Sequence, residues 1–187
     1  MSHRLDRETS GVLVCARDLP TERALKAQFE GRRVQKEYLA IVRGCVFEDQ
    51  GTISLPMRHA EQGLHLLMET CNEGQGAQAE THFDVLERKK DKSLLRLRPH
   101  TGRQHQLRVH LSAKGHPIIG DKLYGPEGIS PFFDYIDEGM TDTLRERLGH
   151  ERHALHAHRL WIEHPGTGQN VEFVAPMPQD LLSLWER

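Results

Sequence analysis

Short runs in which hydrophobic and polar positions alternate recur along the chain, and this pattern is typical of half-buried β-strands. The run VQKEYLAIVRG, from Val34 to Gly44, predicts a strand on which Lys36 and Tyr38 share one face. Residues 77–87 and 92–98 predict two paired strands around the polar turn 88–91. Further strands are expected at 11–16, which is apolar enough to be buried, and at 51–56, 153–164 and 170–176.

Other stretches repeat their hydrophobic residues at helical spacing. One predicted helix runs from Thr21 to about Gly31. A second runs over 103–114, with Leu107 and Leu111 four residues apart and Arg108 on the polar face. Residues 131–148 predict an acidic helical stretch, interpreted as an insertion near 126–150, and a short helix follows Pro178. The polar segment 61–76 is expected to be a hairpin or a surface excursion.

The order of these elements favours an α+β fold. Strands joined in hairpins, with helices set apart from them, predict a mixed, mainly antiparallel sheet flanked by helices. A chain of 187 residues can bury a real core, so we expect one domain over 1–187.

Composition narrows the classes of function. No apolar run approaches the ~20 residues that span a bilayer, and the start lacks the pattern of a secretory signal, so a cytoplasmic protein without a membrane role is expected. Cys15, Cys45 and Cys71 are far apart, which argues against a disulfide scaffold and a thiolate zinc site. No G-x-G-x-x-G motif or phosphate loop is present, so no nucleotide cofactor is expected.

The 13 histidines raise the possibility of a metal site. His156 and His158 would share a strand face near His153, and His105 and His110 share a helix, but no carboxylate or thiolate at metal-site spacing accompanies either group. We therefore expect histidines with structural hydrogen bonds, no metal and no cofactor. A serine hydrolase is also disfavoured, since neither Ser10 nor Ser112 lies in a G-x-S-x-G motif.

Four stretches combine an isolated carboxylate, an arginine and an aromatic residue. They are HRLDRETSGVLVCARD from His3, VQKEYLAIVRG from Val34, HTGRQHQLRVHLSAKGHPIIGDKLYG from His100 and HALHAHRLWIEHP from His153. In this order they resemble segments of the RluA-type RNA pseudouridine synthases. The resemblance implies the pseudouridine synthase fold and an isomerase that converts uridine to pseudouridine in RNA.

The resemblance also implies roles for single residues. Asp6 takes the position of the family's catalytic aspartate, Tyr38 that of its active-site tyrosine, and Arg108 that of the arginine that pairs with the aspartate. Leu155 corresponds to a leucine near the site. These roles suit the chemistry, because a carboxylate can act as nucleophile or base toward the ribose, and an adjacent guanidinium favours its ionised form. The tyrosine offers a ring for an unstacked uracil and a hydroxyl for proton transfer.

Further residues are expected to bind the substrate. Because a base cannot be reached inside a stacked helix, the enzyme should extrude it, and Arg4 could fill the vacated space. Contacts to the nucleotide are expected from Lys36, Arg103, His105, Gln106 and Leu155. Contacts to phosphates, which position RNA without reading its sequence, are expected from Arg32, Arg33, Arg98, Arg103 and Lys114.

Members of the family usually carry a strand and loop before the His-Arg-Leu-Asp motif, which begins here at residue 3. We therefore expect the amino-terminal part of the catalytic domain to be missing, and Asp6 to lie near a terminus that frays unless it is tied down. Two functions stay open: an enzyme that modifies transfer RNA or large-subunit ribosomal RNA, and an inactive, truncated remnant that binds RNA. A monomer is expected in both cases.

Overall fold

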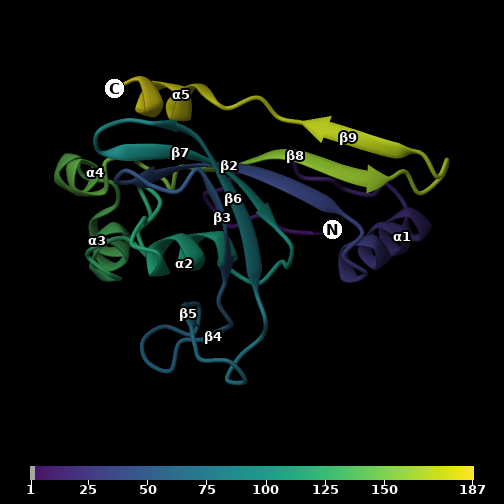
Figure 1. Cartoon of the computed structure of the whole chain (residues 1–187), viewed down its shortest axis with the longest axis horizontal. Coiled ribbons are helices and arrows are strands. Elements are labelled where there is room, and N and C mark those ends of the chain that lie inside the picture. Colours follow the sequence, from purple (N-terminus) through teal and green to yellow (C-terminus); the bar gives the residue numbers. More distant parts are fainter. Residues whose placement is uncertain (1–2) are drawn as a thin grey trace.

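A computed structural model describes residues 3–187 and shows an α+β fold, as predicted. Its main sheet is mixed, with strand order β1-β8-β2-β7-β6-β3 and β9 paired to β8 (Figure 1). The strands of this sheet are β1 (Ser10–Gly11), β2 (Gln35–Arg43), β3 (Gln50–Ser54), β6 (Glu80–Arg88), β7 (Lys92–Pro99), β8 (Leu155–Glu163) and β9 (Asn170–Val174).

All pairs in the sheet are antiparallel except β1 with β8. The central strand β2 is covered on both faces, since Leu39, Ala40, Ile41 and Val42 are all buried. Tyr38 lies opposite Leu97 of β7 on one side and Ala157 of β8 on the other. This register places the predicted tyrosine in the middle of the sheet.

Five helices surround the sheet in the described part of the chain: α1 (Leu19–Glu30), α2 (Gln106–Ala113), α3 (Ser130–Glu138), α4 (Asp142–Leu148) and α5 (Gln179–Glu186). Figure 1 shows α1 at one end of the sheet, α3 and α4 toward the other, and α2 and α5 on opposite sides of β2 and β7. The main core packs sheet residues such as Leu95 and Leu97 against Leu107 and Leu111 of α2. A smaller core joins Leu25 of α1 to β8.

Most of the predicted strands are confirmed, and residues 61–76 belong to a small excursion. It contains β5 (Met68–Thr70), which pairs with β4 (Met57–His59) in a separate two-stranded sheet. Figure 1 shows this sheet projecting away from the main one. No helix among residues 3–187 is both long and apolar enough to cross a membrane.

Three predicted elements differ in the structure. Residues 11–16 are not a buried strand. Only Ser10 and Gly11 pair with β8, because β9 pairs with β8 from Arg159 onward, and Leu13 and Cys15 are exposed. The second helix begins at Gln106 rather than at 103, and Arg108 is buried, not on a polar face. The stretch 131–148 is two helices, separated at Gly139.

Candidate active site

A cleft of about 460 Å³ opens where the amino-terminal segment, the end of α1, β2 and the loop from β7 to α2 meet. Its volume falls within the range of about 300–1,000 Å³ that is common for ligand pockets. Apart from the residues expected to contact phosphates alone, all nine residues predicted to act on or bind the nucleotide line it: Arg4, Asp6, Lys36, Tyr38, Arg103, His105, Gln106, Arg108 and Leu155.

Asp6 lies in the segment before β1, and this segment is tied down. The Thr9 hydroxyl bonds the His153 ring at 2.7 Å, the Ser10 hydroxyl bonds the His156 ring at 2.9 Å, and the Val12 amide donates to the Ala157 carbonyl at 2.9 Å. Gly11 has φ +117°, and a Cβ there would lie 2.1 Å from the Ala157 oxygen. Only glycine permits this close approach, and these contacts tie the segment that carries Asp6 to β8.

Arg108 joins Asp6 to the core. Its Nη1 donates to Asp6 Oδ2 at 3.3 Å, while its Nε and Nη2 donate to the two carboxylate oxygens of Asp121 at 2.7 and 2.8 Å. The Asp121 side chain is fully buried and that of Arg108 is 6% exposed, whereas Asp6 is 25% exposed and faces the cleft. The bidentate pair therefore fixes the guanidinium, and the guanidinium orients the Asp6 carboxylate.

Charge balance keeps this buried pair ionised. Burial raises the pKa of the Asp121 carboxyl, but the hydrogen bonds and charge of Arg108 outweigh it, so the pKa is lowered overall. For Arg108, burial acts to lower the pKa, and Asp121 together with Asp6 raises it well above its usual value. The guanidinium thus remains a permanent cation beside Asp6.

Tyr38 stands in the cleft with its ring against the core. Burial, helped by the negative charge of Asp6, raises the pKa of Tyr38 to about 12. At neutral pH the hydroxyl is therefore a neutral proton donor and acceptor, not a phenolate. Lys36 lines the same cleft from the same strand, as the alternation of β2 predicts, and burial lowers the pKa of its ammonium group.

His105 precedes α2 with a left-handed backbone, φ +54°, which is uncommon for a residue with a side chain. Its Nδ1 bonds the Tyr124 hydroxyl at 2.7 Å, and that hydroxyl accepts a bond from the Met68 amide. The Arg108 guanidinium lies over the Tyr124 ring, with its Cζ 5.0 Å from the centroid of the ring. Burial, with the nearby charge of Arg108, lowers the pKa of His105, so a neutral imidazole faces the cleft.

The side-chain amide of Gln106 makes all its hydrogen bonds within the protein. Its amide nitrogen donates to the Glu80 carbonyl at 2.9 Å and the Thr81 hydroxyl at 3.0 Å, and its amide oxygen accepts from the Thr101 hydroxyl and the Arg103 amide. These bonds use both donors and both lone pairs of the amide. Gln106 therefore holds the cleft loop and has no polar group left for a substrate.

The other predicted binding residues lie at the rim or in the wall. Arg4 makes a 3.4 Å bond to the Gln104 side chain and is exposed, which leaves its guanidinium near the mouth. Arg103 donates to the Gln78 carbonyl at 3.2 Å. Leu155 is a buried apolar part of the wall.

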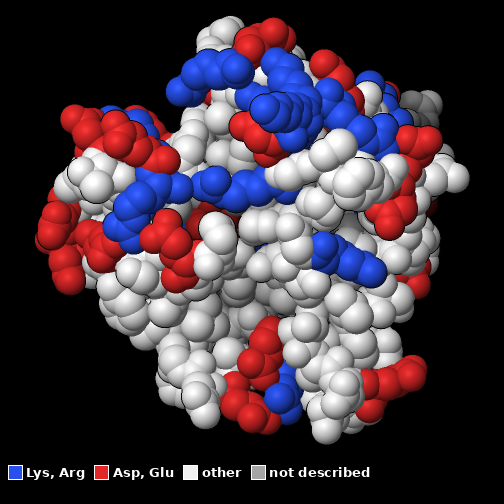
Figure 2. Space-filling model, turned by 60° about the vertical axis from the view of Figure 1, so that its left-hand side comes forward, with Lys and Arg blue, Asp and Glu red and all other residues white. Residues whose placement is uncertain are grey.

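The basic residues expected at phosphates divide into two groups. Arg32 and Arg103 line the cleft, whereas Arg33, Arg98 and Lys114 do not. Arg98 pairs instead with Asp84. On the face shown in Figure 2, Lys and Arg side chains lie next to Asp and Glu side chains, mainly in the upper half of the view. Arg145 and Arg147 also each pair with acids. This face is mixed in charge rather than basic.

The histidines weighed as metal ligands make hydrogen bonds, as expected. His156 and His158 both bond the Ala175 carbonyl, and His110 bonds the Thr81 hydroxyl and the Leu55 carbonyl. His153 is buried behind Asp121, where burial and the charge of Arg108 lower its pKa to about 3.

The sequence reasoning missed Asp121 and Tyr124. Both lie in the GDKLYG end of the third stretch that resembles the family, so a signal was present. Their role depends on the turn after α2, which brings the Asp121 carboxylate back to Arg108, thirteen residues earlier. A sequence pattern does not show that the chain folds back so that Asp121 contacts Arg108.

Comparison with known proteins finds relatives over most of this chain. The model of the RNA pseudouridylate synthase family matches residues 1–113. Ribosomal large subunit pseudouridine synthase D of Pasteurella multocida is 37% identical over 98% of this chain and 54% of its own length. The protein of that name from Xylella fastidiosa is 41% identical over 97% of this chain and 52% of its own length.

Solved structures are similar too. Human RNA pseudouridylate synthase domain containing 1 superimposes with a TM-score of 0.73 at 33% identity, covering 94% of this chain and 67% of that one. Human RNA pseudouridylate synthase domain containing 4 gives 0.75 at 27% identity, covering 99% and 74%. This chain spans about half the length of the curated relatives that it matches. The family model covers more than half of this chain, and the chain belongs to the RNA pseudouridylate synthase family.

Proposed function

We propose that this chain carries the active site of an RNA pseudouridine synthase, with Asp6 as its catalytic carboxylate. The observation that carries the proposal is the arrangement Asp6–Arg108–Asp121: one guanidinium, fixed by a buried carboxylate, holds a second carboxylate at the wall of a cleft. Such an arrangement fixes the position of the Asp6 carboxylate and leaves it accessible to a substrate, because Asp121 forms the structural ion pair with Arg108.

The reaction breaks the bond between N1 of uracil and C1′ of the ribose, turns the base, and joins C5 to C1′. The proton on C5 is lost and N1 gains one, so nothing is oxidised or added. We favour a route through the sugar, in which the Asp6 carboxylate acts on the ribose while the uracil leaves. No cofactor is needed for this balance.

Tyr38 is proposed to act on the base. Its ring can stack on an extruded uracil, and its hydroxyl, kept neutral by a pKa of about 12, can relay the C5 proton but is a poor base by itself. Arg4, at the rim, is proposed to occupy the space left by the extruded base. Arg32 and Arg103 line the same cleft and are proposed to contact phosphates.

The relatives' names favour large-subunit ribosomal RNA over transfer RNA as the substrate. We propose that the chain works on this RNA in the cytoplasm, as a monomer. The rival is an RNA-binding remnant without activity, and no contact in the site favours it, since Asp6, Tyr38 and Arg108 share one cleft.

The test compares wild type with Asp6→Asn on unmodified large-subunit ribosomal RNA and on transfer RNA, with pseudouridine mapped by carbodiimide-dependent reverse-transcription stops. Asp137→Asn, the same change at an exposed position outside the cleft, is the control. We expect stops with wild type and Asp137→Asn, and a loss of at least about a thousandfold in rate with Asp6→Asn at unchanged RNA binding. If wild type binds RNA but leaves no stops, the rival function holds.

A further inference from the structure

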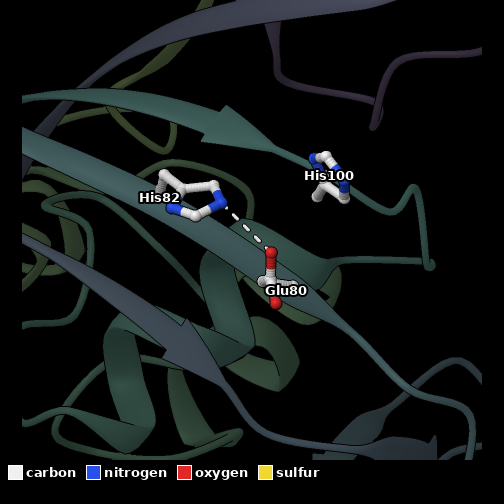
Figure 3. A group of neighbouring side chains, drawn as sticks. All are labelled: Glu80, His82 and His100. Atoms are coloured by element: carbon white, nitrogen blue, oxygen red, sulfur yellow. Dashed lines mark hydrogen bonds and ion pairs between the residues drawn. The ribbon is translucent and has the colours of Figure 1, made fainter. Parts of the chain in front are cut away.

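A second cluster of chemically active side chains lies on β6 and at the end of β7. Glu80 and His82 are two residues apart on β6 and so share a face of the sheet. The His100 amide donates to the Glu80 carbonyl at 2.9 Å, which brings His100 next to Glu80 although twenty positions separate them. Figure 3 shows the His82 ring and the Glu80 carboxylate facing each other, with His100 beside them at the end of β7.

The ligand atoms of these three residues are close enough for one ion. One nitrogen of each histidine and one oxygen of Glu80 all lie within 4.8 Å of one another, and His82 Nε2 is 3.1 Å from Glu80 Oε1. Tetrahedral zinc with bonds of about 2.0–2.2 Å needs its ligand atoms about 3.3–3.5 Å apart. His100 is exposed and its side chain can rotate inward, so the remaining gap can close without a change in the sheet.

A hydrogen bond behind the cluster suits metal binding. The other ring nitrogen of His82, Nδ1, is 2.8 Å from the hydroxyl of Thr52 on the neighbouring strand β3. Histidines that bind metals usually donate their second nitrogen to such a partner, which fixes the ring and directs the free lone pair at the ion. Without metal, Nε2 donates its proton to the Glu80 carboxylate. When an ion replaces this hydrogen bond, Nδ1–H can donate to the Thr52 hydroxyl, and Nε2 is left as the ligand.

From these observations we infer that Glu80, His82 and His100 form a binding site for a divalent transition metal of the zinc class, with water in the fourth position. Two imidazoles and one carboxylate match the ligands that zinc takes in open sites. Among residues 3–187, no other group of three histidines, cysteines or acids has this geometry. The sequence led us to expect no metal, because the histidines considered there are close in sequence, whereas His82 and His100 are brought together by the pairing of β6 and β7.

The site would brace the cleft. His100 begins the loop that continues through Thr101 and Arg103 along the cleft wall. The Glu80 backbone already holds this loop through the Thr101 hydroxyl and the Gln106 amide. An ion shared by Glu80 and His100 adds a further link between β6 and the loop. This role does not depend on activity toward RNA.

The experiment titrates Zn²⁺ into the full chain, without a tag and stripped of metal, by isothermal titration calorimetry. We expect one zinc ion per chain. His82→Gln and His100→Gln should each weaken binding by at least about tenfold, and Thr52→Val, which removes only the supporting hydroxyl, by about tenfold. His65→Gln, the same change at an exposed histidine outside the cluster, should bind like wild type.

Circular dichroism of each variant distinguishes lost binding from lost folding, and unfolding is not expected because the substituted groups are at the surface. Zinc binding by folded His82→Gln and His100→Gln with wild-type affinity would overturn the site. Equal loss in His65→Gln, or no binding by wild type, would overturn it as well.

Discussion

Two pairs of arginine and aspartate lie on opposite faces of the same sheet and differ in what surrounds them. Arg108 and Asp121 are buried next to the cleft, whereas Arg98 and Asp84 join β7 to β6 on the outer face, where 47% and 24% of their side chains are exposed. Glu80 and His82 share this outer face, and His100 lies beside them at the edge of the cleft. The buried pair can hold the Asp6 carboxylate in a fixed position because neither ion can turn to water, while the outer groups remain free to exchange partners.

The largest effect is expected from breaking the buried pair. Asp121→Asn removes one charge and leaves Arg108 with Asp6 alone, so the free energy of unfolding should fall by about 3–5 kcal/mol. Asp84→Asn, the same change in the outer pair, should cost about 1 kcal/mol or less. Urea unfolding of both variants measures the difference. An equal loss in the free energy of unfolding for the two variants would mean that burial does not make the inner pair more stabilising than the outer one.

The next effect concerns the hydroxyl in the cleft. Tyr38→Phe keeps the ring that is proposed to stack on uracil but removes the hydroxyl that is proposed to relay the proton, so the rate should fall by about a hundredfold with little change in RNA binding. Tyr135→Phe changes a tyrosine outside the cleft and serves as the control. Single-turnover rates on the RNA substrate decide the matter. A Tyr38→Phe enzyme with the wild-type rate would show that the hydroxyl takes no part.

A smaller effect should appear in the pH dependence of stability. The pKa of His153 is lowered to about 3 in the folded protein, while an unfolded histidine titrates near pH 6.5. Between these values only the unfolded state binds the proton, so stability is complete above about pH 6.5 and falls as pH decreases, by about 1.4 kcal/mol per pH unit.

Other buried histidines also make the free energy of unfolding depend on pH. The measurement therefore compares the pH dependence of the variant with that of wild type. Urea unfolding between about pH 7 and pH 5 should give His153→Gln a shallower profile than wild type, by about one proton. The exposed His65→Gln should keep the wild-type slope. Parallel profiles for His153→Gln and wild type would contradict the buried neutral state of His153.

The smallest effect is expected on the outer face. Without metal, Glu80→Gln should change the free energy of unfolding by less than about 1 kcal/mol, since the carboxylate and the His82 ring are both partly exposed. With zinc, wild type should gain thermal stability and Glu80→Gln should gain little, because binding to the folded state alone stabilises it. A zinc-independent loss of several kcal/mol would show that Glu80 has a structural role instead.

The sequence alone determined most of the elements and many of the residues that line the cleft. Alternation placed Lys36 and Tyr38 on one face of β2 because neighbouring side chains on a strand point to opposite sides. Resemblance to the family named Asp6 and Arg108, and the structure brings them to 3.3 Å. Local patterns and short motifs are enough for such predictions.

Only the tertiary structure decided how these groups are held. Arg108 depends on Asp121, Gln106 proved to brace a loop, and residues 11–16 stayed largely unpaired because β9 occupies the edge that they would have joined. Glu80, His82 and His100 meet through strand register, which a chain read in order does not reveal. These contacts form between segments that are distant in the sequence. They depend on which surfaces pack against each other and exclude water, and not on neighbours in the chain.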